Sequence, residues 1–209
     1  MIELFTSAFV TLLVIIDPPG CAPIFASLTH DCPPAERRMM AIRSVVIAAG
    51  ILLFFALFGE DLLDALGISL AAFRIAGGIM LFLIALEMVF EKRTERRENR
   101  ANEVNASPER EDISVFPMAI PMIAGPGSIA SIMLLMARSN GLDQSLVVLG
   151  ALGAVLLLTA LALLAAGPLM RLLGHKMEAM ITRILGVILA ALAAQFVIDG
   201  ITISFQISA

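Results

Sequence analysis

Asp17 is the first residue of this chain that could do chemistry in an apolar setting. It lies in "VIIDPPGCAP" (14–23), in the middle of a stretch that is otherwise hydrophobic. A carboxylate at membrane depth is costly and usually marks a path for a substrate or an ion. It could hold an ammonium group or take up a proton. Asp before Pro18 is also a good helix N-cap with proline at the first helical position, so a purely structural role stays open.

A second interruption lies in another apolar stretch, "PMIAGPGSIAS" (121–131), which contains Pro121 and then Gly125, Pro126 and Gly127. In lipid, every backbone N–H and C=O needs a partner, so irregular backbone persists only where it lines a cavity or is buried in protein. Proline removes a donor and clashes with the preceding turn. Both stretches are therefore predicted to be broken helices. Paired Gly/Pro breaks in two repeats indicate a transporter binding site.

The chemistry of the two breaks suits a zwitterion. A half-helix that begins near Gly127 or Ser128 presents N–H groups and the positive end of its dipole, which favours a carboxylate. The half-helix that ends near Ile16 presents carbonyl groups, and Asp17 adds a negative charge, so this end would hold an ammonium group. A small α-amino acid has both groups. A cation alone could use the same carbonyls, so ion transport stays open, as does coupling to a proton or Na⁺.

The elements that position these groups are predicted from composition. The chain has 209 residues, 59% of them hydrophobic and 15% charged, which excludes a soluble domain because its surface would have to face water. A bilayer core takes about 20 apolar residues per helix. We predict an all-α polytopic membrane protein in one transmembrane domain, 1–209, with its first span split into Leu4–Ile16 and Cys21–Leu28. The six predicted spans are Leu4–Leu28, Met39–Phe58, Ala65–Phe90, Ile113–Ala137, Leu146–Met170 and Ala179–Phe205.

Several classes of function are not expected. A net charge of −4 argues against binding nucleic acid. No HExxH or GxSxG motif is present, so we expect no enzyme. The first span lacks a basic leader, with Glu3 as its only early charge, so it is not expected to be a cleaved signal. No cofactor or metal is expected, and His30, His175, Cys21 and Cys32 are not predicted to be ligands.

The longest polar segment, Glu91–Asp112, mixes charges of both signs. Such runs are usually solvated, so it is predicted to be a linker, helical in part at most, with no chemistry. The basic residues of the connections fall almost entirely on one side of the predicted bundle; Arg138 alone lies on the other side. They are Arg37, Arg38, Arg43, Lys92, Arg93, Arg96, Arg97, Arg100, Arg110, Arg171, Lys176 and Arg183. This predicts cytoplasmic connections and both termini outside the inner membrane.

The halves before and after this linker, 1–90 and 113–209, resemble each other. "RIAGGIML" (74–81) matches "RILGVILA" (183–190), and Pro19-Gly20 matches Pro126-Gly127, at offsets of 109 and 107 residues. Three spans per half place the second copy in the membrane from the opposite side. This predicts an inverted repeat.

Two arginines, Arg74 and Arg183, occupy equivalent positions in the repeats, about two turns inside their spans. They could extend toward the interface. Alternatively they form structural or gating ion pairs with Asp17, Glu87 or Asp199.

Small and polar residues mark the third and sixth spans. Gly77, Gly78 and Gly186 are predicted to be close-packing positions between helices. Gln195 and Asp199 are polar groups late in the sixth span. Asp199 is a weaker candidate for a functional carboxylate than Asp17.

The chain resembles, over nearly its whole length, the MarC family of multi-pass bacterial inner-membrane proteins. The matching stretches are "IDPPGCAPIFASLT", "FRIAGGIMLFLIALEM", "FPMAIPMIAGPGSIASIMLLM" and "ILGVILAALAAQFVIDGI". The resemblance implies six helices and, for the family's transporter members, uptake of glycine, alanine and similar small neutral amino acids.

The resemblance also carries over individual positions. These are Asp17, Pro18, Gly20, Pro23, Thr29, Pro121, Gly125, Pro126 and Gly127. The family commonly has Asn directly after the glycine of the first motif, where this chain has Cys21. If that amide contacts substrate in relatives, substrate or affinity differs here.

The sequence therefore predicts a secondary transporter of small neutral amino acids, with the substrate held at facing helix breaks in a lipid bilayer. One alternative is an ion or another small metabolite on the same scaffold. The other is a membrane protein that is not a transporter and acts as a scaffold or a channel.

Overall fold

The computed structural model describes residues 1–105 and 112–205, with side chains at 100, 102–105, 169–176 and 178 outside the description; within these limits every regular element is a helix. Arg110 and the side chains of Arg100, Arg171, His175 and Lys176, used above, lie outside the described part. The elements are α1 (Ile2–Ile16), α2 (Pro18–Leu28), α3 (Pro34–Ala65), α4 (Leu70–Val89), α5 (Lys92–Asn105), η1 (Ser114–Ile123), α6 (Pro126–Met136), α7 (Leu142–Leu164) and α8 (Ala166–Ser204). The all-α membrane prediction is confirmed.

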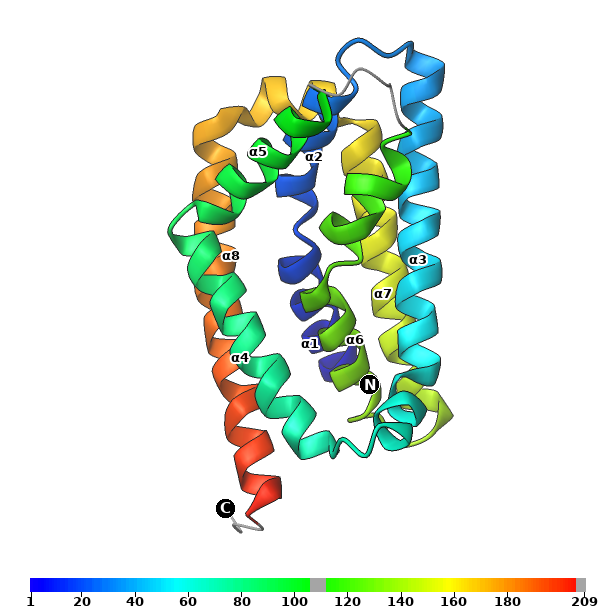
Figure 1. Cartoon of the computed structure of the whole chain (residues 1–209), viewed down its shortest axis with the longest axis vertical. Helices are drawn as coiled ribbons and strands as arrows, with labels where there is room; N and C mark the ends of the chain where they lie inside the picture. Colours follow the sequence, from blue (N-terminus) through cyan, green and yellow to red (C-terminus); the bar gives the residue numbers. More distant parts are fainter. Residues whose placement is uncertain (106–111, 206–209) are drawn as a thin grey trace.

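In the described part of the chain, five helical segments are long and apolar enough to cross a membrane, or six if η1 and α6 count as one bent span. The predicted end of the fifth span at Met170 is wrong, because α7 ends at Leu164 and α8 already begins at Ala166. Apolar residues continue through this turn, so hydropathy did not reveal it. The expected loop after the fifth span is the first part of α8, which lies across the end of the bundle (Figure 1).

The broken helices occupy the centre of the bundle. In the Ile2–Leu28 segment, 72% of the most apolar window is buried inside the protein, against 28–39% in the other four long spans. Figure 1 shows α1, α2 and α6 between α3 and α7 on one side and α4 and α8 on the other. The outer helices present large exposed hydrophobic side chains, as lipid contact requires. Of the five long spans in the described part of the chain, the first broken helix is therefore the one that protein encloses over most of its apolar window.

The two halves of the chain interlock. The middle helix of the second half, α7, packs on α1 and α2, and the middle helix of the first half, α3, packs on η1 and α6. One hydrophobic cluster includes residues of α1, α2, α3, η1, α6 and α7. Each half thus completes the hydrophobic core of the other. This reciprocal packing agrees with an inverted repeat, which stays a prediction.

The third helices of the halves, α4 and α8, meet along a seam of glycines. A Cβ at Gly78 would lie 2.9 Å from the carbonyl oxygen of Ala193, and one at Gly186 would lie 2.9 Å from Cβ of Met88. Gly77 faces α6, where a Cβ would lie 3.1 Å from Leu134. Helix association in lipid depends on such close van der Waals packing. The three predicted glycines therefore lie at tight interhelical contacts.

The connections divide by charge between the two ends of the bundle. Both termini lie at one end, and α5, the α2–α3 connection and the start of α8 lie at the other (Figure 1). The basic segments identified from the sequence therefore gather at the end opposite the termini. Which membrane side this end faces stays a prediction.

Candidate functional site

The first helix break consists of a single residue. Asp17 lies between α1 and α2 with φ 57° and ψ 65°, a left-handed conformation that Asp and Asn adopt more readily than most residues. Its Oδ1 accepts a hydrogen bond from the Gly20 N–H at 3.2 Å, so Asp17 caps α2. Pro18 occupies the first helical position, where a missing N–H costs nothing. The prediction that α2 begins near Cys21 is wrong, because Pro18, Pro19 and Gly20 already form its first turn.

The second break lies at Ala124 and Gly125, where η1 and α6 meet at an angle of 53°. A Cβ on Gly125 would lie 2.4 Å from the carbonyl oxygen of Pro121, so only glycine fits here. The helix α6 begins at Pro126, slightly earlier than the predicted Gly127 or Ser128.

The half-span before this break is less regular than expected. Within η1, Phe116 and Ile120 have extended backbone angles, and each precedes a proline. Proline disfavours a helical conformation in the residue before it. Pro121 alone was predicted to interrupt this half-span, whereas Pro117 was the available signal for its first irregular turn.

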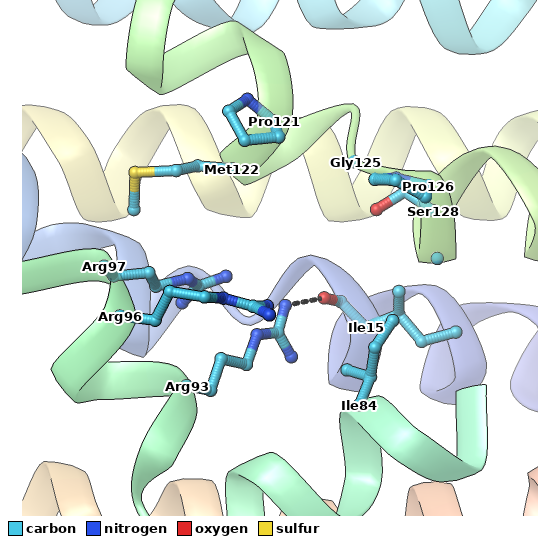
Figure 2. A pocket seen from close by; sticks show the side chains of 11 residues that line it. Ile15, Ile84, Arg93, Arg96, Arg97, Pro121, Met122, Gly125, Pro126 and Ser128 are labelled. Carbon is cyan, nitrogen blue, oxygen red and sulfur yellow. Dashed lines mark hydrogen bonds between the residues drawn. The ribbon is translucent and has the colours of Figure 1, made fainter. Parts of the chain in front are cut away.

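A cavity of about 280 Å³ lies between the two breaks. One wall comes from the second break, the other from α5, and Ile15 and Ile84 close one end (Figure 2). Its lining residues are Ile15, Ile84, Arg93, Arg96, Arg97, Pro121, Met122, Gly125, Pro126, Gly127 and Ser128. The predicted residues of the second break thus line a common cavity with the last turn of α1.

Arg93 of α5 enters this site from a segment that was predicted to be solvated and without chemistry. Arg93 is only 7% exposed, and its guanidinium donates a hydrogen bond to the carbonyl oxygen of Ile15 at 2.6 Å (Figure 2). A second guanidinium nitrogen lies 3.0 Å from Sδ of Met88. Burial, with the neighbouring charge of Arg97 adding to it, lowers the pKa of Arg93 to about 10, so the group stays protonated at neutral pH.

Two further arginines of α5 form ion pairs at the site. Arg97 lies 3.0 Å from Oδ2 of Asp17, and the two side chains are 9% and 1% exposed. Arg96 pairs with Glu87 at 2.8 Å in a more exposed position. Arg93, Arg97 and Ala101 follow one another at intervals of four residues, so they lie on one side of α5, and Ala101 is also buried. Nothing in the sequence of α5 marked this side as the buried one.

Of the two alternatives for Arg74 and Arg183, an ion pair with Asp17 or Glu87 is wrong, because those carboxylates pair with Arg97 and Arg96. Arg183 pairs with Glu91, at 2.6 Å. Asp17 and Glu87 take their partners from α5, a segment that was predicted to be solvated.

The predicted site residues of the first break lie outside the cavity lining: Asp17, Pro18, Pro19, Gly20, Cys21, Pro23 and Thr29. The Cys21 thiol donates to the carbonyl oxygen of Ile16 at 3.4 Å, and the Thr29 hydroxyl donates to that of Phe25 at 2.7 Å. Pro23 lies inside α2. These residues serve the local backbone of the first broken helix in this conformation.

A separate polar cluster lies near the end of α8. Asp199 pairs with Arg138, whose guanidinium also stacks over the ring of Phe196 at 4.6 Å. Gln195 donates to Oδ1 of Asp199 at 2.7 Å, and the largely buried Arg74 lies within electrostatic reach of this pair. The cluster joins α4, α8 and the connection between α6 and α7 at the end near the termini, and none of its members lines the cavity. Among the described residues, no group of three His, Cys, Asp or Glu could hold a metal ion.

Comparison with known proteins agrees with this architecture. The chain matches the family described as MarC family integral membrane protein over residues 2–205. A UPF0056 membrane protein of Methanocaldococcus jannaschii is 39% identical over 200 residues, covering 96% of this chain and 97% of that protein. One from Aquifex aeolicus is 36% identical, covering 95% and 92%, and one from Bacillus subtilis is 33% identical, covering 99% and 98%.

These relatives come from both bacteria and archaea, so the likeness is not restricted to bacteria. No solved structure matches the chain significantly. The family match covers nearly the whole sequence, including both helix breaks. The chain therefore belongs to the MarC family of multi-pass integral membrane proteins.

Proposed function

We propose that this protein is a secondary transporter of small neutral amino acids such as glycine and alanine. The observation that supports it most is the cavity at the centre of the bundle, lined by the second helix break and by Ile15 in the last turn of α1. Ligand pockets generally measure about 300–1,000 Å³, so a cavity of about 280 Å³ suits a small solute. Irregular backbone inside a membrane protein is also the usual place for such a site.

The second break supplies groups for the substrate carboxylate. Gly127 and Ser128 belong to the first turn of α6 and line the cavity. The first N–H groups of a helix have no partner within it, and the helix dipole adds positive charge there. A carboxylate at this end would be stabilised by both effects.

The groups expected to hold the amino end are engaged by α5 in this conformation. The carbonyl of Ile15 accepts from Arg93, and the carboxylate of Asp17 pairs with Arg97. In the proposed cycle these contacts close the pathway at the end that carries the basic connections. Alternating access would then require α5 to release the first break, and proton coupling through Asp17 would act at the same pair.

A metal cation or another cationic cargo fits the site less well, because three arginines line it and would repel the cargo. A small anion remains the main alternative on the same scaffold. Binding by a guanidinium and a helix N-terminus would serve an inorganic anion as well as an amino acid carboxylate.

The test is uptake of labelled alanine into liposomes containing the purified protein. We expect saturable uptake by the wild type and its loss in Gly127→Leu, where a Cβ would already lie 2.7 Å from Ile84. Gly150→Leu is the matched control, since Gly150 on α7 has open space around it. Uptake that never saturates would indicate a channel, and chloride uptake without any response to amino acids would favour the alternative. An imposed pH gradient that leaves the rate unchanged would exclude proton coupling.

A further inference from the structure

Among the described residues, the cavity lining is positively charged and contains no carboxylate. Three of its eleven residues are arginines, and none is acidic. The two nearest carboxylates are each paired with an arginine, Asp17 with Arg97 and Glu87 with Arg96. Both oxygens of Asp17 are engaged, since Oδ1 also accepts from the Gly20 N–H.

Arg93 forms no ion pair with any carboxylate in the described part of the chain. Its hydrogen bonds go to the Ile15 carbonyl and to Sδ of Met88, which are neutral atoms. A buried charge is costly unless it is paired, so a guanidinium nine-tenths buried against neutral partners favours the arrival of an anion.

The opposite wall also favours an anion. Pro126 and Ser128 at the start of α6 lie across the cavity from the arginines (Figure 2), and Gly127 between them in the sequence also lines the cavity. The start of α6 and Arg93 would therefore both attract negative charge. An ammonium group between them would meet the positive arginines on one side and the positive end of a helix dipole on the other.

We propose that the cavity recognises its ligand through a carboxylate held between Arg93 and the start of α6, and that an α-amino group forms no ion pair there. The ligand class is then small aliphatic monocarboxylates, with or without an amino group. The inference rests on the same cavity as the proposed transport function, and extends it from neutral amino acids to their deaminated analogues.

Ligand binding to the purified wild-type protein in detergent tests this without relying on transport. The probes are alanine, propionate, alaninamide and propylamine, each measured by the shift in thermal unfolding with concentration. We expect alanine and propionate to raise the unfolding temperature with dissociation constants within about tenfold of each other, since both present the same carboxylate. Alaninamide and propylamine should produce no shift.

Variants then identify the arginine. Arg93→Gln should weaken propionate binding about 10- to 100-fold, because a hydrogen-bonded charged partner is lost. Arg93→Lys should retain part of the affinity, and it serves as the second variant if Arg93→Gln does not fold. Arg43→Gln is the matched control, since Arg43 lies on α3 and pairs with Asp112 outside the cavity.

Three results would overturn the proposal: alaninamide binding as well as alanine, alanine binding without propionate, or no probe binding at all. Unchanged propionate affinity in both Arg93 variants would overturn the role of that residue. The transport function fails separately, if propionate and alanine bind but neither accumulates in liposomes. Conversely, saturable alanine uptake without propionate binding would leave transport standing and reject this inference.

Discussion

The buried pair between Asp17 and Arg97 gives the most quantitative prediction. Asp17→Asn removes the negative charge but keeps a side chain that caps helices well and accepts the left-handed conformation. Arg97 would then remain 9% exposed without its carboxylate. Removing one partner of a buried ion pair costs about 3–5 kcal/mol. We take the lower figure, because Arg97 has a further interaction.

A loss of about 3 kcal/mol should lower the unfolding temperature by about 6–12 °C in a chain of this size, at about 2–4 °C per kcal/mol. Arg97→Gln should cost a similar amount, because it leaves Asp17 buried and unpaired. The double variant leaves two neutral amides and should cost less than the sum of the single variants, with a coupling energy of about 2–3 kcal/mol.

The assay must suit a chain without tryptophan or tyrosine. Circular dichroism follows the loss of helix in detergent, and a thiol-reactive dye reports the exposure of the buried Cys21. The control is Asp112→Asn, which breaks an exposed pair with Arg43 and should cost less than about 1 kcal/mol. Additive single variants, or losses no larger than the control's, would refute a buried ion pair at the first break.

Further outcomes follow from the same contacts. Gly78→Leu should abolish a monodisperse protein in size-exclusion chromatography, because a Cβ there would lie 2.9 Å from backbone, whereas Gly153→Leu, in open space, should not. Gly125→Ala should reduce alanine uptake at least tenfold through its 2.4 Å contact with backbone, and wild-type rates would argue against a rigid second break. Hydrogen bonding from Ser114 lowers the pKa of Asp112 in the folded protein from its ordinary value of 3.8. The ionised Asp112 carboxylate therefore stabilises the fold above pH 3.8, and this stabilisation is lost as the pH falls through the pKa of the folded state. Wild type should therefore lose more stability than Asp112→Asn in acid denaturation below about pH 4, by a small margin because the carboxyl is partly exposed. A reporter fused to the C-terminus should be active outside the cytoplasm, and cytoplasmic activity would reverse the assigned orientation.

Much of the secondary structure of this protein could be predicted from the local sequence. Long apolar runs require membrane helices, because only a helix satisfies its own backbone in lipid. The break at Asp17 follows from its neighbours, since Asp caps a helix and Pro18 starts one without needing an N–H. Gly125 and Pro126 interrupt the fourth span for related reasons. Family membership was also readable, because the motifs around both breaks are contiguous.

The positions of α5 and its arginines were decided only by the tertiary structure. A run of mixed charges is usually solvated, and nothing in the sequence of Lys92–Asn105 indicates that its arginines have buried partners. Arg97 meets a carboxylate 80 residues away, and Arg93 meets a carbonyl 78 residues away. Those partners come within reach only when α1 and α2 pack against α6, α7 and α8. The physical reason is that a charged side chain becomes a binding group when other elements remove its water, and sequence spacing does not record which elements those are.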